Sequence, residues 1–368
     1  MKLKTLPNSK LKILFLVPYP TEGQSNRFRV EQYLPHLETK GICYSLRPFF
    51  SSEFYRILYQ SDKYFRKVYF FVKCFLRRIF DLFGLFKCDL VFIHREAFPL
   101  GPPFFEILIS KFLKIPLIYD FDDSIFLPQT SKANRAVSFL KYPKKVSQII
   151  KLSQQVIVGN DFLREYAVRF NNNVTVIPTP LDTEKYKSFI SPEKNGVVIG
   201  WIGSHSTAEY LLELKEVFIK LKKVNPDLVI KLIGAETYQN QLPGTDCRAW
   251  KLEEEINELN SFDIGLMPMP DNQWTKGKCA FKLLLYMSMA IPAICSPVGM
   301  NQEIIRDGEN GFLASSPEEW FEQIQTLVRD PDLRKKMGLL GRETVEEKFS
   351  LKLWIPIFID VLEKVAKR

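Results

Sequence analysis

Short apolar runs alternate with amphipathic stretches along almost the whole chain. In the first half these runs predict strands at Lys12–Pro18, Cys43–Pro48, Leu90–His94, Pro116–Tyr119, Gln155–Val158 and Val174–Ile177. The stretches between them predict helices near Arg29–Leu37, Tyr55–Phe83, Pro103–Leu113, Arg135–Leu152 and Phe162–Phe170. Such alternation is typical of a parallel sheet with helices on both faces.

A second alternating set begins at Val197. Its predicted strands are Val197–Gly203, Val229–Gly234, Ile264–Met269 and Pro292–Ser296, and its predicted helices are Ala208–Val224, Glu253–Leu259, one from about Phe281 and one carrying Glu303. The intervening stretch IPTPLDTEKYKSFISPEKNG is rich in proline and polar residues, which is typical of a linker. We therefore expect two doubly wound α/β domains, residues 1–185 and 197–350, joined by a linker at 186–196. The amphipathic stretch 351–368 predicts a last helix that packs back on the first domain.

Composition narrows the class of protein. The 368 residues are 46% hydrophobic and 25% charged, as in a folded globular protein of two domains. Six scattered cysteines without Cys-x-x-Cys spacing favour a reducing, cytoplasmic compartment and argue against a zinc site or disulfides. The N-terminal apolar run is a poor signal peptide, and no uncharged stretch approaches the roughly 20 residues of a membrane span. The net charge of +9 fits anionic partners.

Three loops of the second domain carry residues suited to binding phosphate. They are Gly203–Thr207, the polar loop at 271–278, and the loop at Gly299. Loops that follow parallel strands meet in one crevice, and a glycine before a helix lets backbone amides approach an anion. Lys278 and Lys282 lie one helical turn apart beside apolar residues, so we expect them to need an anionic partner. The alternatives are a plain strand–helix turn with a hydroxyl cap and a surface lysine pair.

In the first domain, acids and arginines follow predicted strands. Asp122 and Asp123 end the run YDFDD, where carboxylates can orient a ligand hydroxyl or stabilise developing positive charge. Arg27 and Arg29 follow the first strand, where contacts to a phosphate or another ligand group would fall. The alternatives are a helix cap for the acids and pairing of the arginines with Glu31.

These motifs resemble those of the GT-B glycosyltransferases, and more narrowly the retaining glycosyltransferase family four (group 1). The residues that carry the resemblance are Gly200–Ser204 with Thr207, Asp263–Gly265, Lys278–Met287 and Pro292–Phe312 in the second half, and Val17–Pro20, Arg27–Arg29, the run YDFDDSIF, Val158–Asn160 and Val176–Pro178 in the first. The resemblance implies a GT-B fold, in which two Rossmann-like domains face an interdomain cleft. It also implies hexosyl transfer from a nucleotide-diphosphate sugar with retention, with no metal and no other cofactor.

The resemblance and the loops together give a set of candidate site residues. The donor set is Gly203, Ser204, His205, Thr207, Lys278, Lys282, Gly299, Met300, Asn301 and Glu303; the acceptor set is Arg27 and Arg29; and the catalytic set is Asp122, Asp123 and Lys282. The sequence departs from the family at one motif, because Gly277 and Leu285 occupy the positions of two glutamates that contact sugar and ribose. The usual arginine after the first strand of this domain is also replaced, by Ser204 and His205.

The segment 54–87 combines basic and aromatic residues. It holds eight Lys or Arg against two acids, and a helical wheel places most of its basic residues opposite Tyr64, Phe65, Phe71, Phe75 and other apolar side chains. This pattern predicts a helix lying on an anionic membrane surface, or alternatively a domain helix with a solvated basic face. Nucleic acid is disfavoured, because the aromatic residues lie away from the charges.

The function predicted is a cytoplasmic glycosyltransferase, peripheral to the membrane, that takes a nucleotide sugar and a cell-envelope, polysaccharide or lipid-linked saccharide acceptor. Two alternatives stay open: a nucleotide-sugar-binding protein with a degenerate site, and a GT-B nucleotide-sugar epimerase. A Rossmann dehydrogenase is disfavoured, because no G-x-G-x-x-G follows the first strand.

Overall fold

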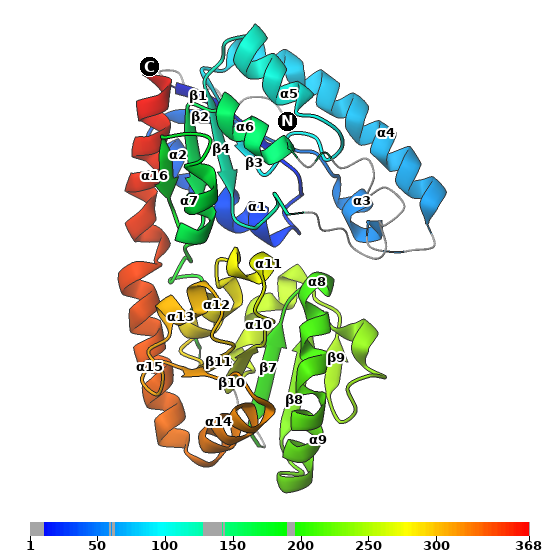
Figure 1. Cartoon of the computed structure of the whole chain (residues 1–368), viewed down its shortest axis with the longest axis vertical. Helices are drawn as coiled ribbons and strands as arrows, with labels where there is room; N and C mark the ends of the chain where they lie inside the picture. The colour runs from blue at the N-terminus through cyan, green and yellow to red at the C-terminus, as the bar shows by residue number, and fades with distance from the viewer. Residues whose placement is uncertain are drawn as a thin grey trace. The chain divides into compact units, whose positions relative to one another are not determined.

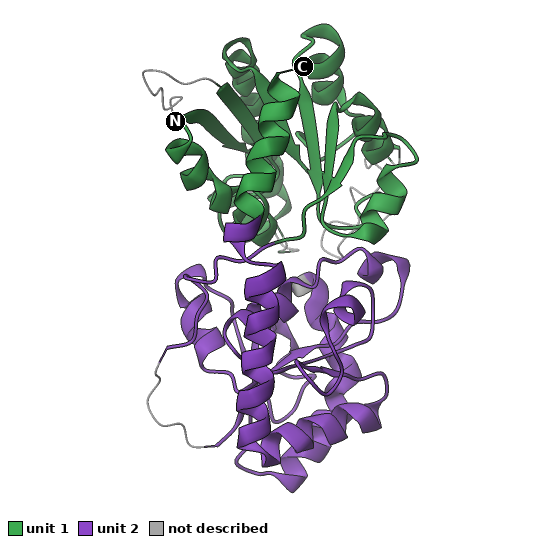
Figure 2. Ribbon diagram, turned by 90° about the vertical axis from the view of Figure 1, so that its left-hand side faces the viewer, with its two compact units in different colours: residues 1–179, 354–368 green, residues 180–353 purple. Residues whose placement is uncertain are grey.

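Each half of the chain folds around its own parallel sheet. The computed structural model describes residues 11–58, 60, 63–127, 142, 144–189 and 196–367. The chain divides into one unit of residues 1–179 with 354–368 and a second unit of residues 180–353 (Figure 2). The division falls after Thr179, earlier than the expected end of the first domain at residue 185. Residues 190–195 of the expected linker lie outside the described part.

The first unit has a six-stranded parallel sheet in the order β2-β1-β3-β4-β5-β6 (Figure 1). Its strands are β1 Leu11–Val17, β2 Ile42–Pro48, β3 Leu90–His94, β4 Leu117–Phe121, β5 Gln155–Val158 and β6 Val174–Val176. Its helices are α1 Gln24–Arg29, α2 Leu34–Thr39, α3 Ser52–Ile57, α4 Tyr64–Asp81, α5 Phe104–Ile107, α6 Lys145–Leu152 and α7 Asp161–Ala167. The predicted helix at 55–83 is two helices, and residues 135–141 and 143 of another predicted helix lie outside the described part.

The second unit has a six-stranded parallel sheet in the order β12-β11-β10-β7-β8-β9. Its strands are β7 Val198–Ile202, β8 Val229–Ile233, β9 Asp246–Arg248, β10 Ile264–Met267, β11 Ala293–Cys295 and β12 Phe312–Leu313. Its helices are α8 His205–Ala208, α9 Lys215–Val224, α10 Glu255–Asn260, α11 Gln273–Lys276, α12 Phe281–Ser288, α13 Met300–Ile304, α14 Pro317–Arg329 and α15 Pro331–Lys348, and α16 Leu351–Ala366 begins here and ends in the first unit. The predicted fold class of two doubly wound α/β sheets is confirmed.

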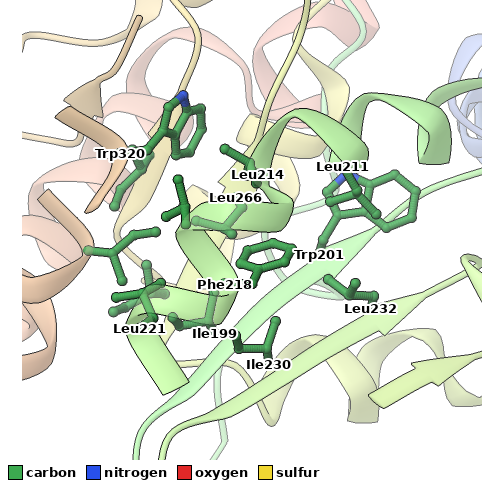
Figure 3. Close-up of a cluster of buried hydrophobic side chains, with 14 of the residues drawn as sticks. Ile199, Trp201, Leu211, Leu214, Phe218, Leu221, Ile230, Leu232, Leu266 and Trp320 are labelled. Atoms are coloured by element: carbon green, nitrogen blue, oxygen red, sulfur yellow. The ribbon is translucent and has the colours of Figure 1, made fainter. Parts of the chain in front are cut away.

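Large apolar side chains fill the space between the second sheet and its helices. Figure 3 shows Phe218 and Leu221 of α9 lying against Ile199 of β7 and Ile230 of β8. Trp201, also on β7, is 1% exposed and lies at the end of this cluster toward the carboxyl edge of the sheet. Burying side chains of this size contributes about 1.5–3 kcal/mol each, so this cluster fixes the position of β7 and of the loop that follows it.

The hydroxyl of Tyr286 bridges the two central strands of the second sheet. β7 and β10 pair only at Ile199–Ile264 and Gly200–Gly265, and diverge beyond that point. There the backbone N–H of Ile202 donates to Tyr286 Oη at 3.1 Å, and the hydroxyl donates to the Leu266 carbonyl at 3.1 Å. Gly265 is required, because a Cβ at that position would collide with the Tyr286 ring. Helix α12 is thereby fastened over the point where the strands separate.

We expect Tyr286→Phe to destabilise the second unit by about 1–3 kcal/mol, because the buried Ile202 N–H then loses its acceptor. Urea unfolding followed by circular dichroism measures the change. The control is Tyr69→Phe, whose side chain is 65% exposed, and which we expect to change stability by less than about 0.5 kcal/mol. Equal unfolding curves for Tyr286→Phe and the unmodified protein would contradict this role of the hydroxyl.

Candidate functional site

Three loops meet at the carboxyl edge of the second sheet. β10 pairs with β7 on one side and with β11 on the other, so the loops that follow these strands are neighbours. The strand order reverses between β7 and β10. Doubly wound sheets bind their ligands at such a reversal, outside the carboxyl ends of the strands. The structure thus brings together the loops at residues 203–204, 268–280 and 296–299, as the sequence predicts.

Lys282 reaches from α12 to the loop that follows β7. Its Nζ lies 5.5 Å from the ring centroid of Trp201, within the range of a cation–π contact. A Cβ on Gly203 would lie 2.7 Å from Lys282 Cε and closer still to the Trp201 ring. Glycine at position 203 therefore makes room for the lysine stem. The Lys282 ammonium group therefore lies beside the indole ring of Trp201 and the first loop. In the sequence, Lys282 belongs to a different motif from Trp201 and Gly203.

The second and third loops pack against each other through their backbones. Gly299 has φ +53°, and a Cβ there would lie 2.9 Å from the Lys276 carbonyl oxygen. Only glycine allows this approach at that backbone conformation. Lys278, in the same loop as Lys276, is half-buried, with its Nζ 5.5 Å from the Trp274 ring centroid. The two predicted lysines thus belong to one edge of the sheet, each beside a tryptophan.

The other predicted donor residues divide into exposed and buried ones. Ser204 is exposed, with its Oγ 3.0 Å from Ser206 Oγ, and Glu303 is exposed on α13. Thr207 is buried, and its hydroxyl donates to the Ser204 carbonyl at 3.2 Å. Ser204 is the N-cap residue of α8, but its side chain makes no cap hydrogen bond, so the hydroxyl cap of the alternative interpretation is not formed. The His205 side chain lies outside the described part.

Two members of the predicted donor set have side chains that point into the protein. Asn301 is fully buried and donates from Nδ2 to the Ser296 carbonyl at 3.0 Å, and Met300 is 7% exposed. Little of either residue is therefore accessible to a ligand. Of the two positions that lack the family's glutamates, Leu285 is fully buried in α12 and Gly277 ends α11. The leucine is therefore part of the core beneath the site.

A buried group of charges lies at the carboxyl edge of the first sheet. His94 ends β3 and is paired in register with Asp120 on β4. His94 Nδ1 lies 2.6 Å from Asp120 Oδ2, and Arg29 donates from Nε to the same oxygen at 3.3 Å and from Nη2 to Oδ1. Arg29 Nη1 also donates to the Ile177 carbonyl at 2.6 Å. Burial alone would raise the pKa of Asp120, but Arg29 and His94 hold it below its usual value.

This geometry corrects the acceptor prediction for Arg29. Its side chain is 2% exposed, pairs with the buried carboxylate of Asp120 and donates to the Ile177 carbonyl. Arg29 therefore holds the end of α1 against the sheet. Arg27 is 8% exposed, with its guanidinium 5.1 Å from the Phe28 ring centroid. It also lowers the pKa of Glu31, a carboxyl whose pKa burial raises. This proximity agrees with the alternative interpretation of Arg27.

Asp122 and Asp123 are held by a residue that the sequence did not single out. Arg95, with φ +60°, donates from Nε to Asp122 Oδ1 at 2.7 Å and from Nη2 to Asp123 Oδ2 at 3.2 Å. His94 Nε2 lies 4.0 Å from Asp122 Oδ1. Burial raises the pKa of Asp122, but Arg95, His94 and Arg29 outweigh it and lower the pKa to about 2. Asp122 is therefore ionised near neutral pH and suited to stabilising positive charge rather than to donating a proton.

His94 was missed because its partners lie on another strand, 26 residues away in sequence. The available signal was its place at the end of a predicted strand next to the run YDFDD. Within the described residues, no group of three or more His, Cys, Asp or Glu side chains is arranged to hold a metal ion.

Comparison with known proteins finds a family similarity in the second unit. The family model for glycosyl transferases group 1 matches residues 196–330. A trehalose synthase from Pyrococcus horikoshii is 21% identical over 197 residues, which are 48% of this chain and 46% of that protein. The alpha-1,3/1,6-mannosyltransferase ALG2 from Homo sapiens is 40% identical over 65 residues, which are 17% of this chain and 16% of that protein. The chain thus spans less than half the length of these curated relatives.

Solved structures show the same fold over nearly the whole chain. A glycosyltransferase from Rickettsia africae ESF-5 gives a TM-score of 0.69 at 15% identity, covering 98% of this chain and 100% of that one. Anabaena Alr3699/HepE in complex with UDP-glucose gives 0.68 at 15% identity, covering 96% and 100%. The chain has the GT-B fold, as the sequence predicts. Its second unit resembles the group 1 glycosyltransferases, whereas the narrower assignment to retaining family four stays a prediction.

The ion pairs of Asp122 give a pH prediction. Its pKa falls from an ordinary 3.8 to about 2 on folding, so ionised Asp122 stabilises the folded state above about pH 4. That contribution, about 2 kcal/mol, is lost as the pH falls toward 2. We expect the free energy of unfolding of Asp122→Asn, measured in urea between pH 5 and pH 2, to depend less on pH than that of the unmodified protein. The exposed Asp332→Asn is the control, and parallel curves for Asp122→Asn and the unmodified protein would refute the ion pair.

Proposed function

We propose that the protein is a glycosyltransferase that moves a hexosyl group from a nucleotide-diphosphate sugar to a saccharide acceptor. The observation that carries this proposal is the placement of Lys282 over Gly203 at the strand-order reversal of the second sheet, with Lys278 in the adjacent loop. Ammonium groups and backbone amides at such an edge suit a diphosphate. Among the similar proteins, HepE was crystallised with UDP-glucose, and ALG2 is named a mannosyltransferase.

The chemistry that these residues supply is stabilisation of the leaving group. As the bond between sugar and diphosphate breaks, negative charge grows on the phosphate oxygens, and a lysine held in place by packing stabilises that charge without reorganisation. Lys282 fits this role, because the Trp201 ring and the Gly203 backbone define where its stem lies. The exposed hydroxyl of Ser204 and the carboxylate of Glu303 are further donor contacts in this proposal. Retention of the anomeric configuration is proposed from family resemblance.

The first unit takes the acceptor in this proposal. Asp122 and Asp123 are partly accessible, with side chains 11% and 17% exposed, so they can accept hydrogen bonds from a sugar hydroxyl. Arg95 donates to both carboxylates and holds them in place. In this proposal Arg95, rather than Arg29, is the arginine beside the acceptor. The acceptor is a cell-envelope, polysaccharide or lipid-linked saccharide, and the reaction takes place in the cytoplasm. No metal or other cofactor has a part in the reaction.

A nucleotide-sugar-binding protein with a degenerate site is the second candidate, favoured by Leu285 and Gly277 at the glutamate positions. An epimerase is the third. The three differ in turnover of a donor sugar: the transferase releases nucleoside diphosphate faster when an acceptor is added, the epimerase releases an altered sugar without acceptor, and the binding protein does neither.

A screen with UDP, GDP, ADP and CMP tests the donor site, because a ligand that binds only the folded state raises the melting temperature. We expect one nucleoside diphosphate to raise it and CMP, with a single phosphate, to have little effect. No shift with any of the four at millimolar concentration would contradict a nucleotide site.

We expect Lys282→Met to weaken binding of that diphosphate at least tenfold, about 1.4 kcal/mol, while keeping the apolar stem against Trp201. Transfer should fall by a further factor, about 10²–10³ in total, since the lost contact is strongest in the transition state. Isothermal titration and diphosphate release measure the two effects. The control is Lys336→Met on the exposed side of α15, which should bind and react as the unmodified protein does. Equal binding by both variants would remove Lys282 from the site.

A further inference from the structure

Helix α4 presents its apolar side to solvent. The α4 apolar face consists of Tyr64, Phe65, Val68, Tyr69, Val72, Leu76, Ile79 and Phe80, and Phe83 and Phe86 continue it in the following turn. Phe65 is 88% exposed and Phe80 is 69% exposed. The helix runs along the outside of the first unit (Figure 1). Exposed apolar patches of this extent on a single element mark interaction sites.

The opposite side of α4 is fixed to the unit by arginines as well as by apolar packing. Arg78 is 1% exposed and donates to the Arg47 carbonyl at 3.1 Å and to the Val17 carbonyl at 3.3 Å. Arg77 donates to the carbonyls of Pro48 and Phe49 at 2.8 and 2.6 Å. These bonds satisfy backbone groups at the ends of β1 and β2, and they set the rotation of the helix about its axis.

The buried side of α4 combines basic and aromatic residues. Phe71 and Cys74 pack with Phe49 and Phe50 in an aromatic cluster beside the buried Arg78. The helix therefore buries a mixed basic and aromatic side. Arg66 and Lys73 are exposed, as the alternative of a domain helix with a solvated basic face predicts, whereas Arg78 is buried. The helical wheel placed Phe71 opposite the basic arc, but in the structure Phe71 packs on the same side as Arg78. The Arg78 guanidinium can be buried because it donates hydrogen bonds to backbone carbonyl oxygens and forms an ion pair with Asp81.

The shape and charge of the exposed side indicate its partner. At about 100° per residue, the α4 apolar face spans about 160° of the helix and about 24 Å of its length. That arc is broader than the narrow seam of a two-helix coiled coil. Arg66 and Lys73 follow one border of the face, within an arc of about 20°. No acidic residue occurs between 63 and 80, so this helix of a second copy would offer no carboxylate to that border.

We propose that the α4 apolar face docks on an anionic phospholipid bilayer. The helix lies in the plane of the membrane, with Phe65, Tyr69, Leu76 and Phe80 at the boundary between headgroups and acyl chains. The basic border contacts headgroup phosphates, and the net charge of +9 adds long-range attraction. No helix in the described residues is long and apolar enough to cross a membrane. The proposal goes beyond the proposed function and does not depend on it.

Vesicle co-sedimentation tests the proposal with the full chain at low salt. We expect binding to vesicles of phosphatidylcholine with phosphatidylglycerol, weaker binding to phosphatidylcholine alone, and a further decrease at high salt. Phe65→Ser with Phe80→Ser should reduce binding at least tenfold, and Arg66→Gln with Lys73→Gln should remove the preference for anionic vesicles. Absence of binding by the unmodified protein to either vesicle would overturn the proposal.

The matched control is Val224→Ser with Leu339→Ser, two side chains of the second unit that are 50% and 54% exposed. It should bind vesicles as the unmodified protein does. Melting temperatures of all variants verify folding. A second measurement uses Tyr69→Trp, whose added fluorescence should shift to shorter wavelength on vesicles if the face enters the boundary. A lipid-free dimer that dissociates in the Phe65→Ser, Phe80→Ser variant, together with no fluorescence shift, would assign the face to a second copy instead.

Discussion

One hydroxyl group holds the candidate donor site together. Where β7 and β10 diverge, neither strand can satisfy the other's backbone groups, and a buried orphan N–H is costly. Tyr286 supplies both the acceptor and the donor from α12, so the strands can separate and still be joined. Lys282 lies one turn before Tyr286 on the same helix, which places the two on one side. The position of the lysine relative to the first loop therefore follows from the hydrogen bonds of the tyrosine.

The two units use charge in different ways. In the second unit the lysines lie at a sheet edge beside glycine and exposed hydroxyls, where the proposed function places the diphosphate. In the first unit a chain of ion pairs runs from buried Arg29 through Asp120 and His94 toward Asp122 and Arg95. Its inner members are closed off from solvent, and its outer carboxylates are partly open. The buried inner residues therefore have a structural role, and the outer carboxylates are the ones that the proposed function uses.

The sequence predicted what depends on local pattern. Buried strands of four or more residues were placed to within a few residues, and Leu90–His94 was predicted with its observed bounds. β12 was missed because it has only two residues. β9, Asp246–Arg248, was missed because it is polar and lacks the apolar run that marks β6 and β11, which also have three residues. The three donor loops were predicted because their meeting follows from parallel topology alone. Contacts across strands, such as His94 with Asp120, depend on register and were not predictable from spacing.

The orientation of α4 was the hardest feature to predict. A helical wheel gives the faces of a helix but not which face is buried, and the usual rule that arginine stays outside fails at Arg78. Its guanidinium donates to carbonyl oxygens near the ends of two strands, and a sequence pattern does not reveal such contacts. The inward turn of Arg29 has the same cause. In both cases the sequence interpretation assigned a long cationic side chain to a ligand or to solvent. In the structure that side chain donates hydrogen bonds to the protein's own carbonyl oxygens or carboxylates.

The path of α16 has a consequence for how the chain is made. Phe358 stacks on Tyr33 with ring centroids 4.1 Å apart and lies 5.6 Å from Phe92, so the first sheet is covered by a segment that follows the whole second unit in the chain. While the ribosome is still translating the second unit, the nascent first unit exposes the apolar surface that Phe358 will later occupy. Co-translational folding of this half therefore stays incomplete until α16 has been synthesised, and its early intermediates need protection from aggregation.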